Sequence, residues 1–166
     1  MRTVLLFAAL SLLPPGSAVA QYTAPAARDT THAANVILVD ALTWGPAPAA
    51  LPAGAQFAVI DGDPSQSGPY IIRLRMPDGY RIPPHSHPTA EYVTVLSGAL
   101  ALGTGDRIDE ARMKTLPAGS FGGLPAEMHH YVIAKGETVV QVHGAGPFTI
   151  VYVNKADDPR QKAGMR

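Results

Sequence analysis

Short apolar segments alternate with turn residues through most of the chain. QFAVI, YIIRLRM and EYVTVL are followed by DGDPSQSG, PDG and SG, and the series continues with ALALG, MHHYVIA, TVVQVHG and PFTIVYV. Brief β-branched and aromatic segments broken by glycine and proline at such short intervals are typical of strands. The pattern therefore predicts an all-β sandwich or barrel.

Three further segments complete the expected secondary structure. NVILVD at 35–40 is an apolar run suited to a strand, and the proline-rich stretch 43–55 reads as an irregular loop. DRIDEARMK is polar enough to form one or two helical turns, with Asp106 as the cap and Glu110 facing Lys114 four residues on. Together these segments predict one barrel domain over residues 35–156, followed by a loose C-terminal tail over residues 157–166.

The first twenty residues have the features of a secretory signal peptide. Arg2 is followed by an apolar run from Val4 to Leu13 and by small residues that suit cleavage near Ala20. Residues 21–34 are small, polar or proline and predict a flexible lead. We therefore expect a periplasmic or secreted protein, and no other segment is long and apolar enough to span a membrane.

Composition narrows the possible chemistry. The chain has no cysteine, which excludes disulfides, a thiolate nucleophile and thiolate metal ligands. Its 13 basic and 13 acidic residues balance, and neither sign gathers in one stretch. We therefore expect no binding to nucleic acid or to an anionic surface.

Histidines and a glutamate stand at the spacing of a metal site. Residues two apart on a strand share a face, so His85 and His87 point the same way, and Glu91 can join them. Two nitrogens and a carboxylate oxygen suit a borderline divalent cation. A solvated loop that binds nothing is the alternative. His129 and His130, on another expected strand, face opposite ways, so only one of them can join the group.

These positions resemble the two sequence motifs of the cupins. The first motif, G-x5-H-x-H-x3,4-E-x6-G, is matched at every place, and the second, G-x5-P-x-G-x2-H-x3-N, is matched at three. The matching residues are Gly79, His85, His87, Glu91, Gly98, Gly119, Pro125 and His130. The spacing of the second motif selects His130. Glu127 and Ala134 replace a glycine and an asparagine of that motif, and neither position is a metal ligand in the family.

The resemblance implies a double-stranded β-helix, a jelly-roll barrel that holds one divalent metal inside. The ligands would be His85, His87, Glu91 and His130, and the metal would be zinc, nickel, copper, manganese or iron. Such a set leaves coordination positions open for water or substrate, as a catalytic site requires. We expect a metal-dependent enzyme of oxygenase, isomerase, lyase or decarboxylase type acting on a small molecule. A non-enzymatic module that holds a metal or ligand is the alternative.

Neighbours of the site follow from strand alternation. Val93, Val95, Met128 and Val132 share faces with the ligands and predict an apolar pocket, although ordinary barrel core is the preferred explanation for all four over contact with a substrate.

Charged and polar candidates for the pocket are fewer, and each has a structural alternative. Arg73 and Arg75 share a face, and they either clamp a carboxylate substrate or form a solvated surface. His143 lies near the barrel mouth or is a structural histidine. We also expect a homodimer, in which residues up to about 40 cross a neighbouring sheet.

Overall fold

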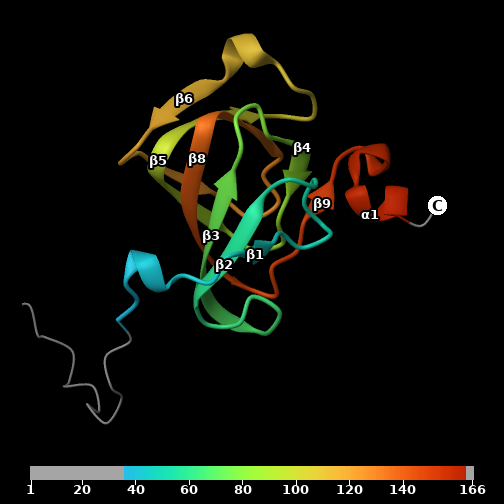
Figure 1. The fold of residues 1–166 in the computed structure, drawn as a ribbon. Coiled ribbons are helices and arrows are strands. Elements are labelled where there is room, and N and C mark those ends of the chain that lie inside the picture. Colours follow the sequence, from blue (N-terminus) through green and yellow to red (C-terminus); the bar gives the residue numbers. More distant parts are fainter. Residues whose placement is uncertain (1–35, 164–166) are drawn as a thin grey trace, which may run out of the picture. The chain divides into compact units, whose positions relative to one another are not determined.

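The computed structural model describes residues 36–163, and the regular secondary structure of this part of the chain is almost entirely β (Figure 1). The strands β1 to β9 are Gly45–Pro46, Gln56–Asp61, Gly68–Met76, Arg81–Ser86, Glu91–Thr104, Lys114–Pro117, Phe121–Leu124, His130–Gly146 and Val151–Tyr152. The helical elements are the 3-10 helices η1 Val39–Ala41, η2 Glu110–Arg112 and η3 Lys155–Asp157, and the α-helix α1 Pro159–Ala163. None of these helices is long and apolar enough to cross a membrane.

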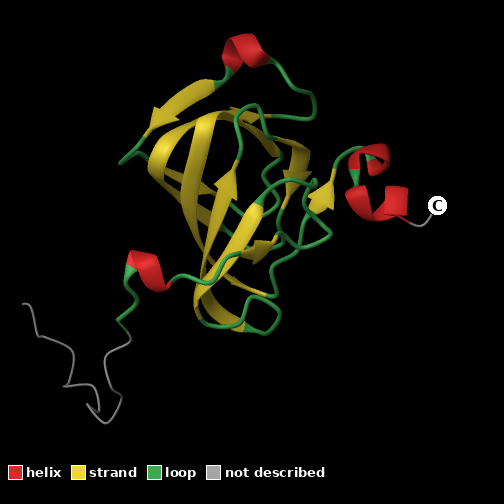
Figure 2. Cartoon of the chain, viewed as in Figure 1, coloured by secondary structure: helices red, strands yellow, loops and turns green. Residues whose placement is uncertain are grey.

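Strand β8 is the centre of the sheet. Its C-terminal part pairs with β3 and β5, and its N-terminal part pairs with β4 and β5. The pairs of β1 with β2, β2 with β3, β4 with β9, and β5 with β6 and β7 are also antiparallel. Figure 2 shows this sheet curling around an interior, with loops joining the strands. The prediction of an all-β jelly-roll barrel is confirmed.

Strand β5 joins two segments that the sequence pattern separates. EYVTVL and ALALG form the single strand β5, and the SG between them lies at an irregularity of the pairing with β8. Gly98 adopts a φ of 71°, and a Cβ at this position would lie 2.3 Å from the carbonyl oxygen of Glu137. Only glycine fits there, because a side chain would be strained and would also collide with the backbone.

The barrel core is built from the inward faces of alternating strands. On β3, Tyr70, Ile72, Leu74 and Met76 are buried, while the residues between them are partly exposed. The buried residues of β5 and β8 complete this core, which includes Val95, Leu100, Ala134, Val140 and Val142. The interior is therefore apolar over most of its length.

The strand predicted at 35–40 is wrong for the residues that the structure describes. Residues 36–38 have no regular structure, and 39–41 form η1. Val36, Leu38 and Val39 are 76%, 69% and 71% exposed. A strand needs a neighbour that satisfies its backbone groups, and sheet pairing in the described chain starts only at Gly45. Asn35, the expected signal peptide and the expected lead lie outside the described residues.

The loop at 43–55 is irregular apart from β1, and two buried tyrosines anchor it. The hydroxyl of Tyr152 donates to the carbonyl of Ala50 at 2.8 Å, and that of Tyr80 donates to the carbonyl of Pro52. Burial, with the charge of Asp158 adding to it, raises the pKa of Tyr152 to about 12. The phenol therefore stays protonated at neutral pH and acts as a hydrogen-bond donor to the loop.

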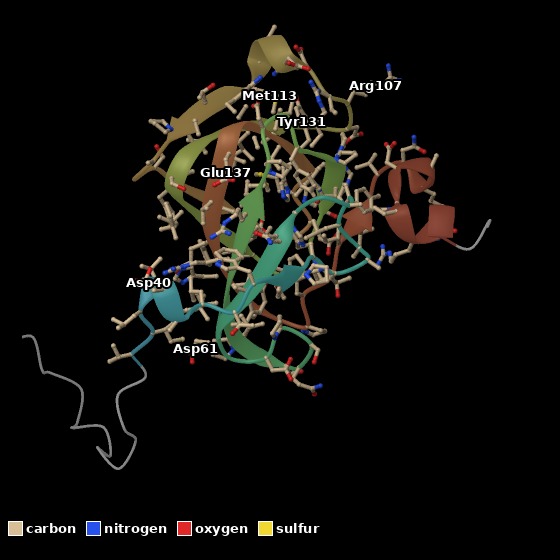
Figure 3. The ribbon with its side chains drawn as sticks, in the orientation of Figure 1. Asp40, Asp61, Arg107, Met113, Tyr131 and Glu137 are labelled. Atoms are coloured by element: carbon tan, nitrogen blue, oxygen red, sulfur yellow. The ribbon has the colours of Figure 1, made fainter. Side chains whose placement is uncertain are left out.

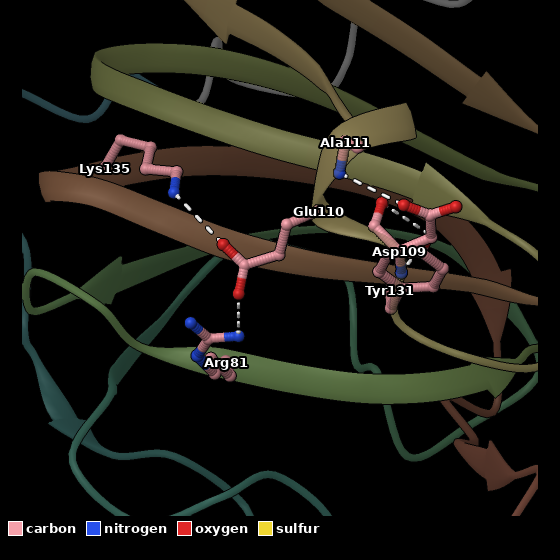
Figure 4. A network of polar contacts seen from close by, with 6 residues as sticks. All are labelled: Arg81, Asp109, Glu110, Ala111, Tyr131 and Lys135. Carbon is pink, nitrogen blue, oxygen red and sulfur yellow. Dashed lines mark hydrogen bonds and ion pairs between the residues drawn. The ribbon is translucent and has the colours of Figure 1, made fainter.

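The loop between β5 and β6 contains the predicted helical turn, but with different contacts. Asp109, not Asp106, caps η2 by accepting a hydrogen bond from the N–H of Ala111 at 3.1 Å. Glu110 pairs with Arg81 at 2.8 Å and with Lys135 at 4.0 Å instead of with Lys114 (Figure 4). Figure 3 shows exposed Arg107 on this loop, pointing away from the barrel.

Part of the C-terminal segment that the sequence predicts to be loose is helical. After η3, α1 spans Pro159–Ala163. The guanidinium of Arg160 donates to both carboxylate oxygens of Asp158 at 2.8 Å and to the carbonyl of Ile150 at 3.0 Å. These bonds connect the segment to the strand region beside it.

Candidate metal centre

Two strands and one loop bring three histidines together. His85 on β4 lies directly opposite His130 on β8 in the antiparallel register, and His87 follows the end of β4. The register is irregular between Ile82 and His85, where two prolines stand. Proline has no N–H to donate to the neighbouring strand, so the ladder is interrupted just before the first histidine.

The three imidazole rings converge inside the barrel. The rings of His85 and His130 have centroids 4.1 Å apart, and the ring of His87 lies 5.1 Å from the first and 5.3 Å from the second. The side chains are buried, at 3%, 2% and 6% exposure for His85, His130 and His87. One ring nitrogen from each lies within 4.8 Å of the others, so the group could hold a metal ion.

The Nδ1 atom of each histidine is held by a backbone carbonyl. His85 Nδ1 lies 2.7 Å from the oxygen of Pro83, His87 Nδ1 lies 2.6 Å from that of Thr149, and His130 Nδ1 lies 2.9 Å from that of Met128. A carbonyl only accepts hydrogen bonds, so the proton of each neutral ring stands on Nδ1. Each Nε2 therefore keeps a free lone pair, which is the form of histidine that binds metals.

Burial keeps His85 uncharged. Desolvation, with the nearby His130 and His87 adding to it, lowers the pKa of His85 to about 3. This imidazole is therefore neutral at any physiological pH. The Nε2 of His87 is buried and has no hydrogen-bond partner. Buried polar atoms in proteins are almost always satisfied, so this atom indicates a ligand that takes its lone pair.

Glu91 lies beside two of the imidazoles. Its Oε2 is 3.4 Å from Nε2 of His130 and 3.6 Å from Nε2 of His87, and its side chain is 12% exposed. Burial by itself raises the pKa of Glu91, but the adjacent imidazoles of His130, His87 and His85 lower it below its ordinary value overall. The carboxylate is therefore ionised at neutral pH and brings a negative charge to the group.

The donor set fits a divalent transition metal. Neutral imidazoles suit zinc, copper, nickel and iron, and an adjacent carboxylate suits the same ions and manganese. The orphaned Nε2 of His87 is the observation in this chain that favours an ion over a simple hydrogen-bond network.

His129 lies outside the group. Its Nδ1 pairs with Oδ1 of Asp106 at 2.6 Å on the surface, with 43% of the side chain exposed. Because successive residues at the start of β8 face opposite ways, His130 points inward.

A cavity of about 30 Å³ adjoins the histidine group. Of the residues predicted to line a pocket, Val93 and Val132 do so, whereas Val95 is packed in the core beside it. Met128 is 37% exposed and is not among the lining residues. The complete lining is Leu74, Met76, Ile82, His85, Glu91, Val93, Leu100, His130, Val132, Val140 and Val142.

The structure places the predicted polar pocket residues on the outer face of the sheet. Nε of Arg73 donates to Gln141 at 2.9 Å, and the amide of Gln141 lies 2.9 Å from Nε2 of His143. The guanidinium of Arg75 stacks over the ring of Trp44, 4.2 Å from its centroid. None of the two arginines and His143 lines the cavity. They alternate with inward-facing apolar residues, so their side chains cannot reach it.

Sequence reasoning missed the segment that holds His87. The carbonyl of Thr149 accepts from this histidine, and the ring of Phe148 stacks on the imidazole with centroids 5.5 Å apart. The ring of Phe148 also meets the ring of Tyr70 edge-on, with centroids 5.9 Å apart. A backbone carbonyl has no sequence signature, so the pattern of residue types offered no signal for this contact.

Several solved structures share the fold of this barrel. A candidate acetylacetone dioxygenase from Methylibium petroleiphilum PM1 has a TM-score of 0.60 at 18% identity, over 83% of this chain and 99% of that one. The polyketide cyclase RemF from Streptomyces resistomycificus has a TM-score of 0.53 at 17% identity, over 67% and 79%. An RmlC-like cupin from Shewanella frigidimarina NCIMB 400 has a TM-score of 0.53 at 11% identity, over 68% and 91%. At these identities the likeness is one of fold.

The barrel defines the class of fold, which is the cupin jelly roll of these solved structures, with three histidines inside it that could hold a metal ion. The resemblance found in the sequence motifs is thereby confirmed. Within that class the chain belongs to the family described as Domain of unknown function (DUF4437), whose model matches residues 7–151. Among curated proteins, none matches the chain.

Proposed function

We propose that this cupin is a metal-dependent enzyme acting on a small organic molecule. His85, His87, His130 and Glu91 would hold one divalent ion of zinc, nickel, copper, manganese or iron. The observation that carries the proposal is the shared orientation of the three imidazoles. Their Nδ1 atoms contact three separate carbonyls, which leaves the three Nε2 atoms free, and one ring nitrogen from each histidine lies within 4.8 Å of the others.

The surroundings favour catalysis over simple storage. A bound ion of this kind supplies an electrophilic centre with coordination positions left for a substrate. The chain contributes a buried apolar wall on one side, which excludes water and strengthens every charge interaction within the site. Glu91 compensates part of the ion's charge and remains ionised because its neighbours lower its pKa. Oxygenation, isomerisation, lyase chemistry and decarboxylation are all compatible with such a site.

The metal site is tested by titrating the chelator-treated full chain with each of the five metals and measuring bound metal by mass spectrometry. We expect one ion per chain, and loss of that ion in His85→Ala, His87→Ala and His130→Ala. His129→Ala is the matched control, because that histidine is a surface residue of the same strand region. Full occupancy in the three variants would contradict the ligand assignment.

The role of Glu91 needs a separate variant. Glu91→Gln keeps the shape of the side chain but removes its charge, so we expect metal affinity to fall by about tenfold or more. Glu137→Gln, on the exposed part of β8, controls for a general change in charge. Equal affinity in Glu91→Gln and the native chain would remove the carboxylate from the proposed ligand set.

Catalysis is tested with the metal-loaded chain over catechols, keto acids and thiols, by dioxygen consumption and by product analysis. Turnover that disappears in His87→Ala supports the enzyme. One bound ion per chain with no turnover of any of these compounds would favour the alternative, a non-enzymatic module that holds a metal or ligand.

We also infer export, from the signal-like first twenty residues, which lie outside the described part of the structure. Fractionation of expressing bacteria, followed by N-terminal sequencing, checks this inference. We expect a periplasmic or secreted chain that starts near Gln21. An intact chain starting at Met1 in the cytoplasm would contradict it.

The exposed apolar side chains at 36–39 support a homodimer. Val36 and Leu38 are 76% and 69% exposed. Light scattering should give about twice the mass of the chain, and the double variant Val36→Ser/Leu38→Ser should give the mass of one chain. A native monomer would rule the dimer out.

A further inference from the structure

The cavity beside the histidine group is polar at one end only. His85, Glu91 and His130 form that end. Every other lining side chain is aliphatic or methionine, and these residues come from β3, β4, β5 and β8. Leu74, Leu100 and Val140 are representative, at 5%, 2% and 2% exposure.

A molecule in the apolar part of the cavity would meet no side-chain hydrogen-bond partner. The wall there consists of CH groups, and the backbone groups of the surrounding strands are engaged in the ladders that join β3, β5 and β8. A hydroxyl or charged group placed there would lose its water without compensation. An alkyl group would instead gain from leaving water.

Among the residues that the structure describes, no arginine or lysine lines this cavity. The two arginines of β3 point outward, where Arg73 is hydrogen-bonded to Gln141 and Arg75 stacks on Trp44. A second anionic group on a substrate would therefore find no counter-charge inside the barrel. Dicarboxylates and phosphorylated compounds are disfavoured for this reason.

The size of the cavity limits the group that it can take. Its volume of about 30 Å³ is room for about two or three water-sized groups. This space matches the end of a short alkyl chain and is too small for a ring with substituents.

We propose that the cavity binds the short alkyl end of the substrate, while the oxygen-bearing head of the same molecule lies at the end formed by His85, Glu91 and His130. This inference rests on the proposed function for the identity of the reacting end. It adds the substrate class, which is a small carbonyl or carboxyl compound with an unsubstituted alkyl tail of two or three carbons. Sugars, hydroxy acids and diacids are excluded.

The test compares two ketones of nearly equal shape on the metal-free full chain. Butanone carries a methyl group where hydroxyacetone carries a hydroxyl. Isotope-labelled methyl groups of valine, leucine and methionine report binding by NMR. We expect butanone to shift the methyl signals of cavity residues and to bind about tenfold or more tightly than hydroxyacetone. Equal affinities, or shifts only at surface methyl groups, would overturn the proposal.

Two variants test whether the preference for butanone over hydroxyacetone arises in the cavity. Val140→Thr places a hydroxyl in the cavity wall with little change in volume, so the preference for butanone should shrink. Val151→Thr makes the same change at a side chain that is 49% exposed and outside the cavity, and should leave the preference unaltered. A preference that is the same in both variants and in the native chain would place the binding elsewhere. If Val140→Thr does not fold, the comparison of the two ketones on the native chain decides.

The two proposals fail in different ways. A chain that takes up no metal but prefers butanone would overturn the proposed function alone. A chain that takes up metal but binds hydroxyacetone as tightly as butanone would overturn only the inference about the substrate.

Discussion

The backbone N–H of Glu127 donates a 2.8 Å hydrogen bond to the carbonyl of His87, and so joins the loop before β8 to the loop after β4. Glu127 has a φ of 62°, and it is the non-glycine residue with a positive φ in the described chain. It stands where the second cupin motif has glycine. The turn is therefore kept in spite of the substitution, at the cost of a strained backbone.

Glu127→Gly should stabilise the protein by about 1 kcal/mol, because glycine adopts this conformation without strain. Thermal and urea unfolding of the metal-free protein measure the change. Glu137→Gly is the matched control, since this exposed glutamate of β8 has an ordinary φ, and glycine there should destabilise by about 0.5–1 kcal/mol. A lower melting temperature for Glu127→Gly would show that its side chain contributes more than its backbone costs.

Alanine substitutions at Gly98 and Gly136 distinguish the cost of a steric clash from the cost of backbone strain. Their φ angles are 71° and 74°, but an added Cβ would meet the Glu137 carbonyl oxygen at 2.3 Å in the first case and nothing within 4 Å in the second. Gly136→Ala should destabilise by about 1–2 kcal/mol from strain alone. Gly98→Ala should cost about 1–3 kcal/mol more, because the strands must also move apart. Equal losses in urea unfolding would mean that the barrel adjusts freely at this point.

Phe148 positions His87 by stacking on its ring. Phe148→Ala should weaken metal binding about tenfold, as expected when a residue that orients a ligand is lost. Calorimetric titration with zinc measures this affinity. The control is Phe121→Ala, which removes a phenylalanine that is 63% exposed and outside the site. Unchanged affinity in Phe148→Ala would show that the Thr149 carbonyl alone orients the imidazole.

Stability of the metal-free protein should depend on pH through His85. Its pKa is about 3 in the folded chain and returns to about 6.5 on unfolding. As the pH falls, the unfolded chain therefore binds the proton first. The stabilisation is complete above about pH 6.5 and is lost progressively toward pH 3, with a limiting slope of about 1.4 kcal/mol per pH unit for one proton.

Melting temperatures measured with a chelator from pH 7.5 down to pH 5 check this dependence. His85→Gln should reduce the dependence of the melting temperature on pH. His143→Gln, on the outer face, should show the same dependence as the native protein. The same slope in His85→Gln and the native chain would assign the pH dependence to other groups.

Sequence patterns determined the fold class and the position of the site. Strand alternation and turn residues predict the barrel because burying one face of a sheet imposes a period of two that is visible in any single chain. The metal-site residues can also be read from short stretches of sequence. His85, His87 and Glu91 stand in the first motif, and His130 stands in the second. The prediction of a strand at 35–40 was wrong because it depended on a partner elsewhere in the chain. An apolar run is a strand only when another strand is present to pair with it, and the sequence does not say whether one is.

Tertiary structure alone decided which faces point inward. A period of two shows that Arg73 and Arg75 share a face but leaves open whether that face meets the core or solvent. In the folded barrel the opposite, apolar face of β3 is the buried one, which leaves the arginines on the outer face. The partners that orient the histidines are also invisible in the sequence, because the backbone carbonyls of Pro83, Met128 and Thr149 are chemically the same as those of any other residue. Residue types record what a face can bind, whereas only the closed barrel fixes what each side chain reaches.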